Sequence, residues 1–535
     1  MKKIFLILAI IATYIILPSC TDMLEEDNKV KVSSSYVYST PDGLRRASIA
    51  LYNIERTILQ VSNAGLFAAL MFDAPSDLMI CRTGDGVEFF RTNYLSSSTL
   101  ILSYWTNRYD IIGKANEIIF NAEKLGLDDP IVKHAWGEAK LFRARMYFDL
   151  YRRFGRLYLN TEPTTVDNLE RIFTPAKTED VFAVINKDLD DAMEALDWKP
   201  SGTTTANTEY GRMTRTIAKH VKAQVAMWID DWDTAIEQCE DIFNNSGYSL
   251  ESSAIVNFQG ENLNTKENLY VFQFSESLAG GSTISQAGVI IGHHMSLHTT
   301  PRYDLLGAGM VFAADYGGYG WGRNYPNAHI FTLYDKTKDK RYTELFRHEY
   351  TYNNPLNALY GQKATCPAAN FVERLHPMSM KYFDRWTNST SPSRQYSFKD
   401  LVIYRLAETY LMASEAYMRK YGGNHAKALE YYNKTWMRAG NAQFAGPVTI
   451  DNILDENARE SNFEGTRWYL LKRTGKLKEK VLTYGGETAA ENPLLSGDFE
   501  FPRRNFEDKH MYWPIPLSQI DMMGRTNFPQ TAGWD

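Results

Sequence analysis

The sequence predicts a mainly α-helical fold, in which helical pairs form a scaffold that carries an irregular, loop-rich part. Three observations predict this fold. Long stretches repeat apolar residues every three or four positions. Two of these stretches break at a short turn and continue as a second helix. Between about 251 and 395, by contrast, the chain is rich in Gly, Asn, Ser, Pro and aromatic residues and has few long periodic runs.

The chain begins with the features of an export signal. Lys2 and Lys3 precede the apolar run IFLILAIIATYIIL, which is shorter than the roughly 20 residues of a membrane span. The leader ends in LPSC, which resembles the bacterial lipobox, where a peptidase cuts before the cysteine and the thiol carries diacylglycerol. We therefore expect a signal peptide over 1–19, lipidation at Cys20 and a polar tether over 20–35. A transmembrane anchor is the alternative.

Two single helices are predicted in the first half of the chain. Over 134–155, apolar side chains recur at spacings of three and four, and Gly155 ends the pattern. The periodic residues are Ala135, Ala139, Phe142, Met146, Leu150 and Phe154. A second helix is predicted over 177–197, where Thr178 can cap the N-terminus and the acidic residues after it favour the positive helix end.

Two further stretches have the form of a helical pair. The first, over 216–247, turns at an Asp-Asp step, 230–231. The second, over 401–440, turns at a Gly-Gly step, 422–423. Their Ala, Leu and aromatic spacing resembles tetratricopeptide units, in which each pair buries a face against its neighbour.

Composition argues against several classes of function. The formal net charge is -6 and no block of basic residues is present, which argues against a nucleic-acid partner. Apart from Cys20, the cysteines are Cys81, Cys239 and Cys366, which are far apart and are expected to be buried thiols rather than disulfides or zinc ligands. No G-x-S-x-G, Walker sequence or paired His/Cys arrangement appears, so we predict no catalytic residue and no cofactor.

Seven stretches, in order along the chain, resemble one known family. They are CTDML (20–24), STPDGLRRASIALYN (39–53), YWTNRYDIIGKAN (104–116), GEAKLFRARMYFDLYRRFG (137–155), RLAETYLMASEAY (405–417), ILDENARESNFEGTRWYLLKRTGKL (453–477) and YWPIPLSQI (512–520). Together they make the chain similar to outer-membrane lipoproteins of the SusD/RagB type. Departures occur at 457–458, at 461–462 and in the final TAGWD, where the family often has a QNPGY-like end.

This resemblance implies a fold, a location and a function. It implies a SusD-like domain over 36–535, with a helical scaffold at about 36–250 and 396–480 and a loop-rich, ligand-facing insert at about 251–395. Family members bind oligosaccharides, or in some cases peptides, at the cell surface, sit as lids on a TonB-dependent SusC-type transporter and are not enzymes. In such lipoproteins, an acidic cluster like the one after Cys20 accompanies export to the outer face of the outer membrane; a merely solvated linker is the alternative.

The segment DYGGYGWGRNY, 315–325, is the strongest local candidate for sugar binding. Sugars are bound by flat apolar rings together with planar polar side chains. Glycines let the backbone turn and leave such rings exposed. The candidate ligand contacts here are Tyr316, Tyr319, Trp321, Arg323 and Asn324. The alternative is that the rings fold back into the core beneath a turn.

A second set of ligand contacts is carried over from the family. Its members place polar loop residues and a tryptophan from the corresponding regions near the ligand, which implies Asp77, Arg82 and Trp105. Trp105 is equally consistent with helix packing.

Two other constellations are interpreted as structural. His294 and His298 have the i, i+4 spacing of metal ligands, but no Glu completes an H-E-x-x-H, and we predict no metal. Glu408 and Glu415 lie about 10.5 Å apart along a helix, too far for the roughly 5 to 5.5 Å of a retaining glycosidase pair. We instead expect Glu408 to pair with Arg405, three residues earlier.

The sequence leaves four functions open. The main hypothesis is a surface lipoprotein that captures oligosaccharides and hands them to a transporter. Capture of peptides or glycopeptides is the first alternative. A secreted glycoside hydrolase and a transporter subunit without a ligand of its own are the others.

Overall fold

The structure of the chain is a computed structural model that describes ten stretches: 34–59, 65–82, 86–168, 172–200, 210–260, 263–275, 292–366, 372–389, 391–495 and 498–534. The predicted signal peptide over 1–19, Cys20 and most of the tether over 20–35 lie outside these residues. In the described stretches, no helix combines the length and the apolar character needed to cross a membrane.

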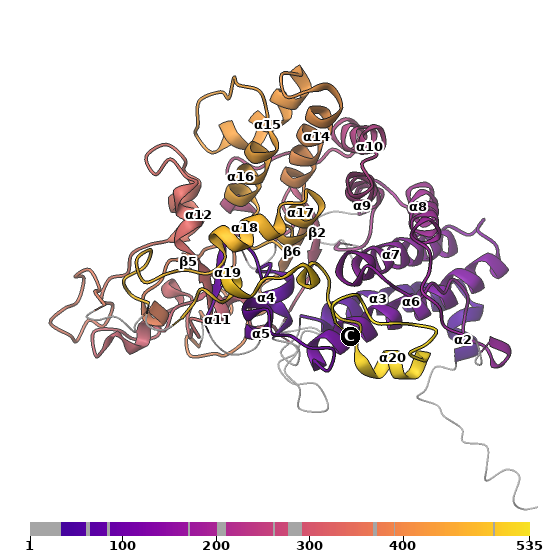
Figure 1. Ribbon diagram of the computed structural model, residues 1–535, viewed down its shortest axis with the longest axis horizontal. Helices are drawn as coiled ribbons and strands as arrows, with labels where there is room; N and C mark the ends of the chain where they lie inside the picture. Colours follow the sequence, from indigo (N-terminus) through magenta and orange to yellow (C-terminus); the bar gives the residue numbers. More distant parts are fainter. Residues whose placement is uncertain are drawn as a thin grey trace, which may run out of the picture.

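Helices dominate the described chain, which confirms the predicted fold class (Figure 1). The first half contains α2 (Ser34–Ser39), α3 (Pro41–Thr57), α4 (Leu66–Leu70), α5 (Val87–Arg91), α6 (Thr99–Leu125), α7 (Pro130–Phe154), α8 (Thr178–Ala195), α9 (Arg215–Trp228) and α10 (Trp232–Asn245). The second half contains α14 (Leu406–Tyr421), α15 (Ala426–Arg438), α16 (Ile450–Glu460), α17 (Arg467–Arg473), α18 (Leu477–Tyr484), α19 (Phe501–Asn505) and α20 (Leu517–Met523).

The helices predicted over 134–155 and 177–197 are α7 and α8. α7 begins after Asp129, whose carboxylate accepts hydrogen bonds from two backbone N–H groups of the first turn, and ends at Gly155, which has a left-handed φ of 64°. The predicted cap of α8 is wrong. Thr178 is itself the first helical residue. The N-cap position before it is occupied by Lys177, whose side chain makes no capping hydrogen bond.

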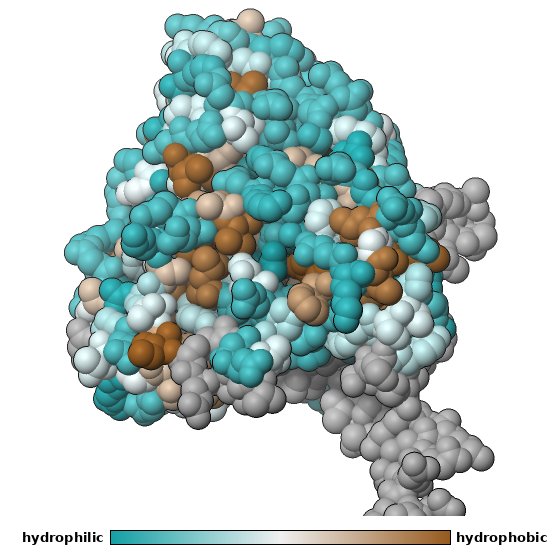
Figure 2. All heavy atoms as spheres, turned by 90° about the vertical axis from the view of Figure 1, so that its right-hand side faces the viewer, coloured by the Kyte–Doolittle hydropathy of each residue, from teal (hydrophilic) through white to brown (hydrophobic). Residues whose placement is uncertain are grey.

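The predicted helical pairs are α9 with α10 and α14 with α15, and the members of each pair pack together. α10 also packs against α14, so pairs from the two halves of the chain join in one scaffold (Figure 1). The face of the scaffold seen in Figure 2 is largely hydrophilic, with apolar side chains gathered in separate patches. One main core runs through this scaffold, from Leu44 to Phe528.

The start of the second predicted pair is a strand rather than a helix. Residues 401–405 form β6 (Leu401–Arg405), which pairs antiparallel with β2 (Asn268–Phe272). The segment LVIY favours a strand because β-branched and aromatic side chains pack well on a pleated surface. Two shorter antiparallel pairs are β1 (Met79–Cys81) with β3 (Asn324–Pro326) and β4 (Phe346–Arg347) with β5 (Met378–Ser379).

Between β2 and β6 the described chain consists of short elements joined by loops (Figure 1). Its helices are α11 (Met295–Thr299), α12 (Ala328–Thr332) and α13 (Arg341–Glu344). This part has a small core of its own, made by Tyr303, Met310, Tyr350, Tyr352, Ala364 and Met378. It is therefore held partly by its own packing and partly by contacts to the scaffold.

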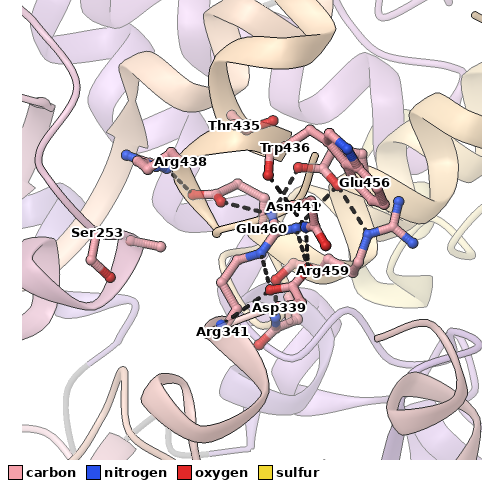
Figure 3. A network of polar contacts seen from close by, with 12 residues as sticks. Ser253, Asp339, Arg341, Thr435, Trp436, Arg438, Asn441, Glu456, Arg459 and Glu460 are labelled. Atoms are coloured by element: carbon pink, nitrogen blue, oxygen red, sulfur yellow. Dashed lines mark hydrogen bonds and ion pairs between the residues drawn. The ribbon is translucent and has the colours of Figure 1, made fainter. Parts of the chain in front are cut away.

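A buried network of charges ties the loop-rich part to the scaffold (Figure 3). Arg341, at the start of α13, pairs with Asp339 at 2.7 Å, with Glu456 at 2.7 Å and with Glu460 at 3.0 Å. Glu460, at the end of α16, also pairs with Arg405 at 3.0 Å. Because these side chains are almost fully buried, each charge depends on the others for compensation.

Candidate functional site

The backbone of 315–325 is pressed closely against its neighbours, and two glycines make this possible. A Cβ on Gly320 would lie 2.3 Å from the carbonyl oxygen of Thr300, and one on Gly322 would lie 2.4 Å from that of Glu373. Gly322 also has a left-handed φ of 57°. The glycines therefore allow this loop to turn within contact distance of two other loops.

Trp321 is half-buried and lies against two histidines and one arginine. The rings of His294 and His298 meet it edge to face, with centroid distances of 4.5 and 5.2 Å. The guanidinium of Arg323 lies 4.2 Å from the centroid of the indole ring. The indole is thus held in place from within the protein and covered by a half-buried cation.

Arg82 is brought to the same place by the pairing of β1 with β3. Its backbone N–H donates to the carbonyl oxygen of Arg323 at 2.8 Å, and its Nε donates to that of Gly322 at 3.3 Å. Its guanidinium pairs with the carboxylate of Glu373 at 2.8 Å. Both side chains remain about one quarter exposed, so this ion pair lies at the surface, next to the backbone of Gly322 and Arg323.

Tyr319 is linked to Glu373 through Arg302. The carbonyl oxygen of Glu373 accepts the backbone N–H of Arg302 at 2.7 Å, and the Arg302 guanidinium lies 5.3 Å from the ring centroid of Tyr319. Arg302 also makes a two-point ion pair with Asp304, at 2.9 Å for each contact. Phe312 packs against Tyr319 at 5.4 Å.

We use the name aromatic platform for the half-buried group Arg82, Arg302, Tyr319, Trp321, Arg323 and Glu373. Four of its members were predicted from the sequence. Arg302 and Glu373 were not, because each is a single charged residue in a loop-rich stretch and only the fold places it against the predicted segment. With two rings, one ion pair and two further guanidinium groups, the platform suits a ligand that carries both flat apolar faces and hydroxyl groups.

The other predicted contacts do not join the platform. Tyr316 is half-buried, but its hydroxyl is fixed on Thr351, where it donates to the carbonyl oxygen at 2.6 Å, and its ring packs against Tyr303. Asn324 is buried, and its amide lies 2.7 Å from Nδ1 of His298. Both side chains are held by neighbours inside the loop-rich part.

Asp77 and Trp105 require a correction, since the structure places both in the interior. Asp77 is fully buried and forms a two-point ion pair with Arg467, at 2.9 and 2.6 Å. Trp105 is 2 % exposed and packs edge to face on Phe154 at 4.9 Å. Neither side chain faces the surface, because Asp77 is held by Arg467 at the start of α17 and the Trp105 ring of α6 packs on α7.

The two histidines beneath Trp321 are kept neutral by their surroundings. Burial lowers the pKa of His294 to about 4 and that of His298 well below its ordinary value. In the part of the chain that the structure describes, no group of three His, Cys, Asp or Glu side chains could hold a metal ion. The rings of His294 and His298 both pack against the indole of Trp321.

Glu408 and Glu415, the two carboxylates compared above with a glycosidase pair, both have partners inside the protein. Glu415 makes two contacts with Arg473, at 2.8 and 2.7 Å, and Glu408 accepts a hydrogen bond from Gln224 at 2.9 Å. The predicted pair of Arg405 with Glu408 is wrong. Arg405 ends β6 and binds Glu464 at 2.7 Å instead, because a strand residue does not follow helical spacing.

Cys81 and Cys239 are free thiols. Cys81 and Cys239 are buried, as predicted, and burial raises the pKa of Cys81 to about 12. Cys366 is half-buried, so the prediction of a buried thiol is wrong for this residue.

Comparison with known proteins gives matches over most of the chain. Residues 293–534 match the model of the SusD family. "SusD-like protein P25" of Formosa agariphila is 22% identical, over 94% of this chain and 94% of its own length. "SusD-like protein P2" of the same organism is 24% identical, over 81% of each chain.

Solved structures have the same fold. A "Laminarin binding SusD-like protein" superposes with a TM-score of 0.71 and 20% identity, over 92% of this chain and 99% of that one. "Surface glycan-binding protein A from Bacteroides fluxus" gives a TM-score of 0.69 and 20% identity, over 92% of this chain and 100% of that one. These similarities extend to the scaffold and the loop-rich part alike.

Proposed function

We propose that the chain, which matches the SusD family over residues 293–534, is a glycan-binding protein of that family whose ligand lies on the aromatic platform. The observation that carries this proposal is the position of Trp321, which is half-buried and is followed by Gly322 and Arg323, whose carbonyl oxygens hold Arg82 of the Arg82–Glu373 ion pair. The names of the solved relatives, which include laminarin- and glycan-binding proteins, support the same ligand class.

The chemistry of the platform supports oligosaccharides in particular. An indole and a phenol ring supply apolar surface for the C–H faces of pyranose rings, on the side of each ring that its arginine, Arg323 or Arg302, does not cover. Guanidinium and carboxylate groups offer planar pairs of donors and acceptors to neighbouring hydroxyl groups. Because Glu373 is paired with Arg82 and Asp304 with Arg302, these carboxylates serve to orient polar groups, which supports binding rather than hydrolysis.

We further propose a location and a partner. The LPSC leader supports lipidation at Cys20, and the acidic tether supports exposure at the outer face of the outer membrane. A SusC-like TonB-dependent transporter is the proposed partner that receives the oligosaccharide, and this rests on the family resemblance. The proposed activity involves no covalent chemistry and no cofactor.

The test is a glycan array on the chain that begins just after Cys20, with Trp321→Ala as the site variant. Trp198→Ala is the matched control, since Trp198 is also half-buried beside an arginine, Arg215, but lies on the scaffold. We expect binding to one class of glycan that Trp321→Ala loses and Trp198→Ala keeps.

Each other outcome points to a different function. Glycan binding that Trp321→Ala retains would keep the function but remove Trp321 from the site. Binding to peptides that survives removal of all sugars would favour peptide capture, and cleaved products after long incubation would show an enzyme. No ligand at all, with a transporter still co-purifying from membranes, would favour a structural subunit.

A further inference from the structure

A cavity of about 150 Å³ lies within the helical scaffold, and we call it the scaffold cavity. Its lining residues come mostly from helices of both halves of the chain, chiefly α7 and α9 from the first and α14 and α17 from the second. No member of the aromatic platform lines it. Its volume is several times the roughly 30 Å³ that one water occupies in the liquid, so it has room for a small molecule.

Three buried arginines from α6 and α7 line the scaffold cavity and share two carboxylates. Arg145 pairs with Glu55 at 2.7 Å. Asp149 pairs with Arg152 at 2.6 Å and with Arg108 at 3.4 Å. This group of five side chains therefore has one positive charge more than its own carboxylates compensate.

Several donors of these arginines and of the neighbouring lining residue Tyr104 have no hydrogen-bond partner in the protein. They are Nη1 of Arg145, Nε of Arg152, Nε of Arg108 and the hydroxyl of Tyr104. All four side chains are more than nine-tenths buried. Because a buried donor without a partner is costly, this group favours a ligand with a carboxylate.

Gln224 of α9 and Glu408 of α14, on the lining of the scaffold cavity, offer hydrogen-bond acceptors instead of donors. Gln224 donates through its amide nitrogen to Glu408 at 2.9 Å, which leaves its buried Oε1 as an acceptor without a partner. Glu408 also lies 3.2 Å from Nε2 of His220. An acceptor and a carboxylate next to each other favour a ligand with an ammonium group.

The charge of the whole lining decides the net charge of the ligand. Four arginines and five carboxylates line the scaffold cavity, and one of the carboxylates, Glu464, is also held by Arg405 and Lys381 from outside the lining. The lining is therefore close to neutral. A ligand with a net charge would bring a buried charge without compensation, whereas a dipolar molecule would not.

We propose that the scaffold cavity binds a small zwitterion of the α-amino acid class. Its carboxylate lies against the unpartnered donors of Arg145, Arg152 and Tyr104. Its ammonium group lies against Gln224 and Glu408. This site is separate from the aromatic platform and does not depend on the proposed glycan function.

Isothermal titration of the chain that begins just after Cys20 tests this proposal, with L-alanine as the probe. Acetate represents the carboxylate end of the zwitterion alone, and methylammonium represents its ammonium end alone. D-glucose is the control molecule without charged groups. We expect L-alanine to bind more tightly than either half and D-glucose not to bind. Tyr104→Phe removes one charge-assisted hydrogen bond and should weaken L-alanine about tenfold.

Tyr350→Phe is the matched control, because it also removes a buried hydroxyl that has no partner but lies in the core of the loop-rich part. It should leave L-alanine binding unchanged. Gln224→Met should weaken L-alanine about tenfold and leave acetate unchanged, since it acts on the ammonium end. Glycan binding should persist in all three variants.

Three results would overturn the proposal. The first is the absence of L-alanine binding, with only ordered water in the scaffold cavity of a crystal grown with L-alanine. The second is equal L-alanine affinity in Tyr104→Phe and Tyr350→Phe. The third is D-glucose bound in the scaffold cavity in place of the zwitterion.

Discussion

Asp77 and Arg467 form a two-point ion pair across 390 residues of sequence, with distances of 2.9 and 2.6 Å. Both side chains are almost completely buried. Burial acts to raise the pKa of Asp77, but the Arg467 guanidinium outweighs it and holds that pKa below its ordinary value. The pair joins the start of α17 to the segment before β1, which continues into Arg82 of the aromatic platform.

Asp77→Ala should therefore act on stability. It leaves Arg467 as a buried charge without compensation, and we expect a loss of about 3–5 kcal/mol in the free energy of unfolding. Urea unfolding measures this loss. If Asp77 were instead a ligand contact, the variant would keep its stability and lose glycan binding at a temperature where it is fully folded.

Arg405→Met should be among the most destabilising changes in α14 and its surroundings. Arg405 is 1% exposed and binds Glu267 at 2.7 Å and Glu460 at 3.0 Å, so its loss leaves buried carboxylates without their cation. We expect a cost of about 3–5 kcal/mol. Arg419→Met is the control, because Arg419 is 35% exposed and its ion pair with Glu415 should contribute less than about 1 kcal/mol. Equal effects of the two variants on the free energy of unfolding in urea would contradict the role of Arg405 as the cation that compensates buried carboxylates.

Glu373→Gln should weaken glycan binding without unfolding the protein. The change removes the ion pair that orients Arg82 but keeps the shape and the carbonyl oxygen that anchors Arg302. We expect roughly tenfold weaker binding in a titration with the glycan found on the array, as for one charge-assisted contact. The control is Glu349→Gln, which breaks an exposed pair with Lys363 elsewhere in the loop-rich part. A Glu373→Gln affinity equal to that of the control would exclude Glu373 from the site.

His293 should make the protein sensitive to acid. Its Nε2 donates to the carbonyl oxygen of Lys399 at 2.6 Å, and its Nδ1 accepts the backbone N–H of Met295 at 3.2 Å, so the folded protein needs the neutral ring. Burial lowers the pKa of His293 to about 4, below the value of about 6.5 expected in the unfolded chain. The stability that this residue contributes is therefore complete above pH 6.5 and is lost as the pH falls towards 4.

Between pH 7.5 and pH 5, this loss should reach about 2 kcal/mol for His293 alone. We expect His293→Gln to show a correspondingly smaller loss of stability over the same interval. The measurement is the free energy of unfolding in urea at both pH values. Other histidines whose pKa is lowered, His329 and His376 among them, add to the slope in both proteins, so the difference between the two proteins is the informative quantity. Identical slopes would contradict a neutral, buried His293.

The helical part of the fold was predictable because it is encoded locally. α7 and the turns at 230–231 and 422–423 follow from apolar spacing and from residues that favour turns, all within a few positions of each other. β6 was missed for the opposite reason. Its partner, β2, lies more than a hundred residues earlier, and a short apolar run next to a helix has no periodicity that distinguishes it.

The aromatic platform was likewise predictable only where its residues are close together in the sequence. The segment 315–325 was recognisable because rings, glycines and polar side chains follow one another directly. Arg302 and Glu373 were not recognisable, since a lone arginine and a lone glutamate in loops have no local signal. They become neighbours of Tyr319 and Trp321 only through the packing of separate loops.

The sequence by itself therefore determined the fold class, the family resemblance and one ring-rich loop, because each depends on residues close together in the chain or on their order. Only the tertiary structure decided which side chains face solvent and which charges compensate each other. Asp77 and Trp105 have the residue types of a binding site, yet one is paired with Arg467 and the other is packed on Phe154. Burial and partner choice depend on contacts between distant segments, and these exist only once the chain has folded.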